Sequence, residues 1–130
     1  MSNADRTHQG GCHCGAVTYT FVAPSRISVQ RCNCSICAMT GFLHFIVLTD
    51  HFSLKTGREV LQKYQFNTKV AQHLFCLNCG VKSYYIPRSN PNGISINLNC
   101  VDQSSFDQIH IENFDGQNWE ENAAKLAHLA

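Results

Sequence analysis

Seven of the eight cysteines in the sequence lie in three short groups whose spacing suits a bound metal ion. The first group is Cys12-His13-Cys14, the second is Cys32-Asn33-Cys34-Ser35-Ile36-Cys37, and the third is Cys76-Leu77-Asn78-Cys79. Thiolates are preferred zinc ligands, and such short spacings let neighbouring sulfurs reach one ion. Cysteines one residue apart form a disulfide only with strain, so the spacing favours metal binding over disulfides.

The number of sulfurs in each group limits how they can be shared between ions. One C-x-C turn and the C-x-x-C pair together supply four sulfurs, which predicts a closed structural zinc site made of Cys12, Cys14, Cys76 and Cys79. The central Cys32, Cys34 and Cys37 would hold a second zinc ion and leave one tetrahedral position for water or substrate, as catalytic zinc sites do. Alternatively, Cys100, His44 or His73 fills that position and closes the site.

Three thiolates around Zn²⁺ form an anionic centre, which suits a particular kind of substrate. Such an ion is a weak Lewis acid toward water but binds another soft donor well, so we expect a thiol as the small-molecule partner. A thiol bound as thiolate is nucleophilic and can add to an aldehyde or release it in the reverse direction. Arg31, Lys82 and Arg88 are candidate cations for an acidic substrate, and Ser83, Tyr84 and Tyr85 could supply hydroxyl groups.

The remaining sequence predicts a mainly β fold of antiparallel strands. Apolar and β-branched runs separated by turn residues predict strands at 16–22, 27–31, 42–48, 52–55, 60–66, 70–75, 81–86 and 94–99. The last of these alternates strictly and is expected to be half-buried, whereas the stretch with the three central cysteines is expected to be a loop. Asn118 and Glu121 resemble a capping box and predict one short C-terminal helix at about 118–127.

Length, composition and charge exclude several other classes of protein. A chain of 130 residues with 44% hydrophobic and 15% charged residues fits a single domain, 1–130, with a core at about 8–122. A net charge of +1 without a Lys/Arg cluster does not predict nucleic-acid binding, and no apolar run is long enough for a membrane span. The polar first ten residues lead us to expect a cytoplasmic protein, where thiols stay reduced. Nothing in the sequence indicates an oligomeric state.

Three motifs in this order resemble a known family. Gly-Gly-Cys-His-Cys-Gly-Ala-Val at 10–17, Cys-Asn-Cys-Ser-Ile-Cys at 32–37 with Gly41 following, and Phe-Cys-Leu-Asn-Cys-Gly at 75–80 are similar to those of the glutathione-dependent formaldehyde-activating enzymes and centromere protein V. The resemblance spans nearly the whole chain. It implies a zinc-binding domain with an Mss4-like β-tent, structural zinc on the four outer cysteines and catalytic zinc on the central three.

The activity that this resemblance implies is that of a carbon–sulfur lyase, which joins formaldehyde and glutathione to S-(hydroxymethyl)glutathione or splits the adduct. Two other functions stay open at this point. The chain could be a non-catalytic, zinc-stabilised binding module, or a thiol-redox or aldehyde-scavenging protein in which Cys32, Cys34 and Cys37 react directly.

Overall fold

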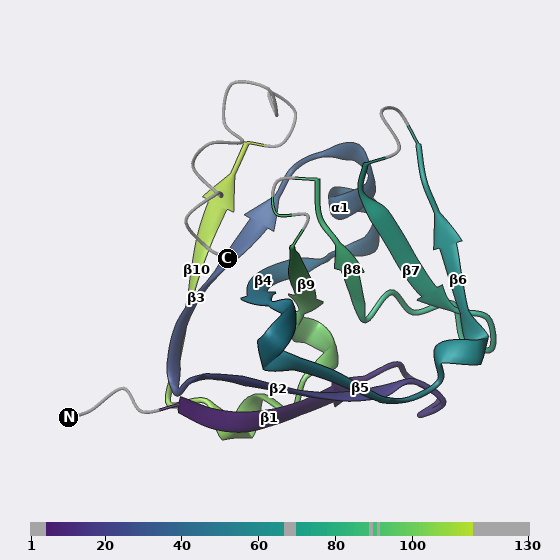
Figure 1. Ribbon diagram of the computed structural model, residues 1–130. Helices are drawn as coiled ribbons and strands as arrows, with labels where there is room; N and C mark the ends of the chain where they lie inside the picture. Colours follow the sequence, from purple (N-terminus) through teal and green to yellow (C-terminus); the bar gives the residue numbers. More distant parts are fainter. Residues whose placement is uncertain (1–4, 67–69, 89, 91, 116–130) are drawn as a thin grey trace.

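The protein, described by a computed structural model over residues 5–66, 70–88, 90 and 92–115, contains two β-sheets (Figure 1). The smaller sheet has the strand order β1 (Asp5–Gly11), β2 (Thr18–Pro24) and β5 (Phe52–Thr56). The larger has the order β10 (Gln108–Phe114), β3 (Arg26–Cys32), β4 (Leu43–Leu48), β9 (Gly93–Asn97), β8 (Tyr84–Ile86), β7 (Gln72–Cys76) and β6 (Leu61–Tyr64). Short helices are α1 (Ser35–Thr40) and the 3-10 turns η1 (Thr49–His51), η2 (Arg58–Val60), η3 (Leu98–Cys100) and η4 (Gln103–Ser105).

The mainly β prediction is confirmed, and each predicted strand overlaps a strand of the structure. Two further strands, β1 and β10, were not predicted. All pairs of neighbouring strands are antiparallel except β10 and β3, which run parallel. That pair aligns Phe114 with Cys32, so both strands end at the same edge of the sheet.

The core lies between the two sheets, and aromatic side chains from β2 fill much of it. Alternation along β2 directs Tyr19 and Phe21 inward, where both are 1% exposed. The Tyr19 ring meets the Tyr84 ring of the large sheet edge-on, with 5.6 Å between centroids. Its hydroxyl donates a hydrogen bond of 2.9 Å to the backbone oxygen of Ser83. This contact ties the small sheet to the segment that leads into β8.

Two predictions about local structure were wrong. All residues of β9 are buried, although its alternating sequence predicted a half-buried strand. Its polar residues are covered as well, because Ser95 contacts His44 and the Asn97 side chain accepts a hydrogen bond from the backbone N–H of Leu43. The stretch with the central cysteines is also more regular than a loop, since α1 begins after Cys34 and ends at Gly41. The six-residue helix forms because Ser35 to Thr40 contains neither proline nor glycine, and Gly41, with φ of 65°, terminates it.

The predicted C-terminal helix at 118–127 lies outside the described residues. Among residues 5–66, 70–88, 90 and 92–115, no helix has the length and apolar character that crossing a bilayer would require.

Candidate metal centres and the pocket beside them

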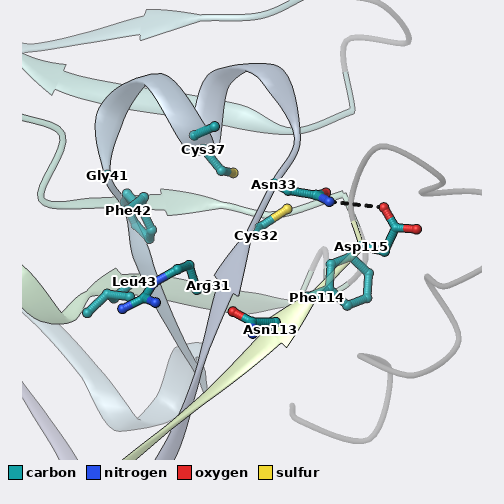
Figure 2. Close-up of a pocket in the computed structure, with 11 residues that line it drawn as sticks. Arg31, Cys32, Asn33, Cys37, Gly41, Phe42, Leu43, Asn113, Phe114 and Asp115 are labelled. Atoms are coloured by element: carbon teal, nitrogen blue, oxygen red, sulfur yellow. Dashed lines mark hydrogen bonds between the residues drawn. The ribbon is translucent and has the colours of Figure 1, made fainter.

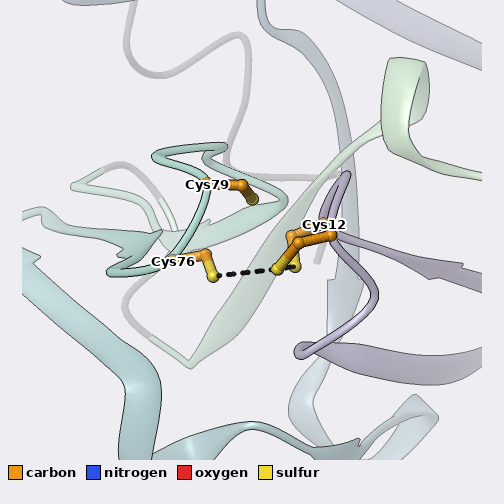
Figure 3. Close-up of side chains that lie close together, drawn as sticks. Cys12, Cys76 and Cys79 are labelled. Carbon is orange, nitrogen blue, oxygen red and sulfur yellow. Dashed lines mark hydrogen bonds between the residues drawn. The ribbon is translucent and has the colours of Figure 1, made fainter.

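The four outer cysteines come together from distant parts of the chain, as their spacing predicted. Cys12 and Cys14 stand in the turn between β1 and β2, while Cys76 ends β7 and Cys79 lies in the turn after it (Figure 3). Their four sulfur atoms all lie within 4.8 Å of one another, so the group could hold a metal ion. The Cys12–Cys14 and Cys14–Cys76 sulfur distances are 3.6 Å and 3.7 Å.

These distances test whether the group fits zinc. A tetrahedron with Zn–S bonds of about 2.3 Å has sulfur–sulfur edges of about 3.8 Å, which the observed spacings approach. An all-sulfur donor set also suits zinc better than magnesium or calcium. The turn is built for such a site, because Gly80 adopts a φ of 77° and donates its backbone N–H to the Cys76 carbonyl at 2.7 Å. Backbone N–H groups of Cys14 and Val81 lower the pKa of Cys79 to about 6, which favours its thiolate.

The three central cysteines form the second group that could hold a metal ion. Cys32 is the last residue of β3, Cys34 caps the N-terminus of α1, and Cys37 lies one turn into that helix. Their three sulfurs also lie within 4.8 Å of one another. The neighbouring Cys32 and Cys37 thiols lower the pKa of Cys34, whereas hydrogen bonding to Cys32 and burial raise the pKa of Cys37. Contact among the three sulfurs therefore already favours a thiolate at Cys34.

A pocket of about 540 Å³ opens beside this central group (Figure 2). It lies where β3, α1 and the end of β10 meet, and Cys32 and Cys37 form part of its wall. The other residues of the wall are Arg31, Asn33, Ala38, Gly41, Phe42, Leu43, Asn113, Phe114 and Asp115. Asn33 donates a hydrogen bond of 3.2 Å to Asp115 across it. The site thus offers sulfurs, amides, a guanidinium and a carboxylate together with apolar side chains.

Phe42 and Phe114 are buried residues, at 1% and 8% exposure, that also belong to the pocket wall. Asn113 and Asp115 were not anticipated at all, because β10 was not predicted. The alternation of Ile109 and Ile111 with polar residues was the available signal for that strand. Its parallel pairing with β3, which places it here, has no local signature.

His44 lies directly behind the central cysteines. Its Nε2 is 3.2 Å from the Cys37 sulfur, and its Nδ1 is 3.2 Å from the Tyr85 hydroxyl and 3.1 Å from the Ser95 hydroxyl. Burial lowers the pKa of His44 to about 3, so the ring is neutral. We assign its proton to Nε2, because hydroxyl groups donate to Nδ1 and the sulfur is the acceptor on the other side.

The three candidates for a fourth ligand are placed differently by the structure. The group of ligand atoms that lie within 4.8 Å of one another consists of the three central sulfurs, and it includes no atom of Cys100, His44 or His73. His44 contacts one of the central sulfurs, that of Cys37, and His73 Nδ1 is 2.6 Å from Lys82 Nζ. Cys100 lies in η3 and is partly exposed. Burial raises its pKa to about 11, with smaller contributions from the charges of Cys12 and Cys79.

The three candidate cations and three candidate hydroxyls also have different positions. Arg31 lines the pocket, whereas Lys82 is buried behind it, and neither Arg88 nor Lys82 forms its wall. Tyr85 contacts His44. Ser83 is buried, and Tyr84 packs against Tyr19 in the core.

Taken together, the fold and the two groups define a mainly β protein with two cysteine clusters, each able to hold a metal ion, one of them at the wall of a pocket. The model of the glutathione-dependent formaldehyde-activating enzyme family matches residues 7–117, and the chain therefore belongs to this family.

Two individual proteins are similar to this chain, one in part of its sequence and one in its structure. A protein of Halomonas elongata, provisionally described as a glutathione-dependent formaldehyde-activating enzyme, is 50% identical over 33 residues. That stretch covers 25% of this chain and only 21% of the relative. The crystal structure of a Rhodobacter sphaeroides protein is similar with a TM-score of 0.67 and 29% identity, covering 80% of this chain and 99% of that one.

Proposed function

We propose that this protein is a zinc-dependent carbon–sulfur lyase-like enzyme that acts on a thiol–aldehyde adduct and resembles S-(hydroxymethyl)glutathione synthase. The observation that carries the proposal is that the sulfurs of Cys32, Cys34 and Cys37 converge and that two of these residues, Cys32 and Cys37, line a pocket with room for a substrate. Family membership supports glutathione and formaldehyde as the pair to test first. We further propose that the two sheets form a β-tent of the Mss4-like kind.

The cysteines would divide between two zinc ions. Cys12, Cys14, Cys76 and Cys79 would hold a structural ion that joins the β1–β2 turn to the turn after β7, and Cys32, Cys34 and Cys37 would hold the catalytic one. When bound there, zinc lowers the pKa of a thiol that ligates it, so that the thiol reacts as a thiolate at neutral pH.

The reaction is an addition without any change in oxidation state. The lone pair of the thiolate sulfur forms the new carbon–sulfur bond, the carbonyl π pair moves to oxygen, and that oxygen takes up a proton. Cleavage reverses each of these steps. The pocket residues would serve this chemistry by binding and by excluding water, with Phe42 and Phe114 as apolar side chains and Arg31 as the cation for a substrate carboxylate.

His44 would act on the central site through Cys37. A hydrogen bond from its Nε2 to the Cys37 sulfur draws negative charge away from that thiolate and fixes its orientation. His44 is itself held by the Tyr85 and Ser95 hydroxyls, so the orientation of Cys37 depends on β4, β8 and β9 together.

The proposal is tested by measuring exchange between free formaldehyde, glutathione and their adduct by NMR with the zinc-loaded protein. We expect the wild-type chain to accelerate exchange and Cys34→Ser to lose the acceleration, while Cys100→Ser, which removes a cysteine outside both groups, retains it. Acceleration that persists after zinc removal with all thiols reduced would instead support direct reaction of the cysteines. No acceleration in the wild-type protein would refute the lyase assignment and favour the binding module.

A further inference from the structure

Lys82 is a buried cation for which the chemistry described so far has no use. It follows the outer cysteine turn by three residues and is 8% exposed. Its Nζ lies 2.6 Å from His73 Nδ1, 4.0 Å from the centroid of the Tyr85 ring and 4.9 Å from that of Phe42 (distances that place it between two ring faces). In the described part of the chain, no carboxylate forms an ion pair with it.

A buried ammonium without an anionic partner is costly, and the three groups around Lys82 carry no negative charge that would offset the cost. His73 is neutral, because burial and the charge of Lys82 lower its pKa to about 4. The two aromatic faces attract a cation only modestly. The negative charge that would stabilise this lysine must come from elsewhere.

The central cysteines are a source of such charge. Burial lowers the pKa of Lys82 to about 8, and the charges that oppose this effect belong to Cys37, Cys34 and Cys32. With this pKa the lysine stays mostly protonated at neutral pH. Its contacts lead to the same group, because Phe42 lines the pocket together with Cys32 and Cys37, and Tyr85 contacts His44, which in turn contacts Cys37.

Lys82 is not among the residues that line the pocket. Phe42, which does line the pocket, presents its ring to the ammonium, and Tyr85 contacts both the ammonium and His44. A substrate in the pocket would meet Phe42 first. Lys82 is therefore placed to act on the cysteine group through its charge and not by touching substrate.

We propose that Lys82 is the built-in counter-charge of the central three-thiolate site, a positioning residue that favours both zinc binding and the capture of a substrate thiolate. The inference rests on the proposed zinc site. Three thiolates and Zn²⁺ sum to a net charge of −1, and a fourth thiolate brings it to −2, so a fixed positive charge nearby stabilises each product more than its reactants.

The test compares zinc affinity in the full chain among variants that differ in one charge. Lys82→Met removes the ammonium but keeps an unbranched chain, Lys82→Arg keeps the charge, and Lys55→Met removes an equal charge from an exposed position on β5. Competition with a chromophoric chelator measures the zinc affinity of each of the two sites. Zinc affinity at the central site should weaken on the order of tenfold or more in Lys82→Met and in neither of the other variants. An equal effect at both sites, or in Lys55→Met, would overturn the proposal.

A second measurement needs no loss of the lysine, in case Lys82→Met fails to fold. With ¹³Cε-labelled lysine, the Lys82 signal, assigned by its absence in Lys82→Arg, is titrated with and without zinc at the central site. The pKa of Lys82 should rise when the ion is bound, and an unchanged pKa would refute the counter-charge role. Neither readout depends on turnover, so a wild-type chain that binds zinc without catalysing exchange would refute the lyase assignment while leaving Lys82's role intact.

Discussion

Replacing His44 with phenylalanine isolates the support that this ring gives to the central cysteines. A phenyl ring retains the packing against Phe42 and Tyr85, whose centroids lie 4.6 Å and 5.5 Å away, but removes both nitrogens. The Cys37 sulfur would lose its N–H donor, and the hydroxyls of Tyr85 and Ser95 would lose their shared acceptor.

The size of the effect follows from those hydrogen bonds. One buried hydrogen bond contributes about 0.5–1.5 kcal/mol net, and one unsatisfied buried donor costs about 1–3 kcal/mol. The two hydroxyls can pair with each other, which leaves one hydroxyl hydrogen without an acceptor. We therefore expect His44→Phe to lower the free energy of unfolding by about 2–4 kcal/mol.

Urea denaturation of the zinc-loaded protein at constant free zinc measures this loss, with His51→Phe at an exposed position as the matched control. Cobalt substitution adds a second readout, because the charge-transfer absorption of the central site should shift when Cys37 loses its donor while the number of bound ions stays at two. A loss of stability within about 0.5 kcal/mol of the control would refute the network. Loss of the central ion would show instead that His44 is a ligand.

Three further predictions follow from other parts of the fold. Gly57→Ala should lower the free energy of unfolding by about 2–4 kcal/mol in urea titrations. The reason is that Gly57 has a φ of 95° and that the new Cβ would lie 2.5 Å from the Ala16 carbonyl oxygen. An unchanged urea midpoint would contradict this turn geometry. The pKa of His73 is lowered from 6.5 to about 4 by burial and then by the charge of Lys82, so the unfolded chain binds an additional proton between these values and stability should fall as the pH is lowered through this window. The stability of His73→Phe should fall less steeply over the same pH range. Parallel curves of stability against pH for the variant and the wild type would disprove this assignment to His73. Cys76→Ser should lose the outer ion and unfold, which near-UV circular dichroism would detect, since structural zinc contributes on the order of 10 kcal/mol to folding. A folded variant that still binds two ions would show that Cys76 is dispensable.

Much of the site could be anticipated because cysteine spacing is a local property. The C-x-C and C-x-x-C intervals indicated the same two groups that the fold brings together, although the zinc ions remain a prediction. The strands that carry the two cysteine groups were likewise predicted, because short apolar runs between turn residues indicate buried strands. The helix α1 was not, since six residues give too short a period to distinguish a turn of helix from a loop.

The rest of the site depends on contacts between residues far apart in sequence. His44 contacts Cys37, and the Lys82 ammonium lies over the rings of Tyr85 and Phe42. The residues that neighbour His44 and Lys82 in sequence give no sign of these contacts. β10 illustrates the same point, because its parallel pairing with β3 brings Phe114 beside Cys32 across more than eighty positions of sequence.

The order and spacing of the cysteines by themselves determined that this chain carries two groups of thiols with different numbers of sulfurs, because ligands for one ion can be supplied by residues close together in the chain. Only the tertiary structure decided what surrounds them. A pocket wall, a hydrogen bond to a sulfur and a buried charge each arise when separate strands meet, and burial changes the energy of a polar group by more than its own identity does.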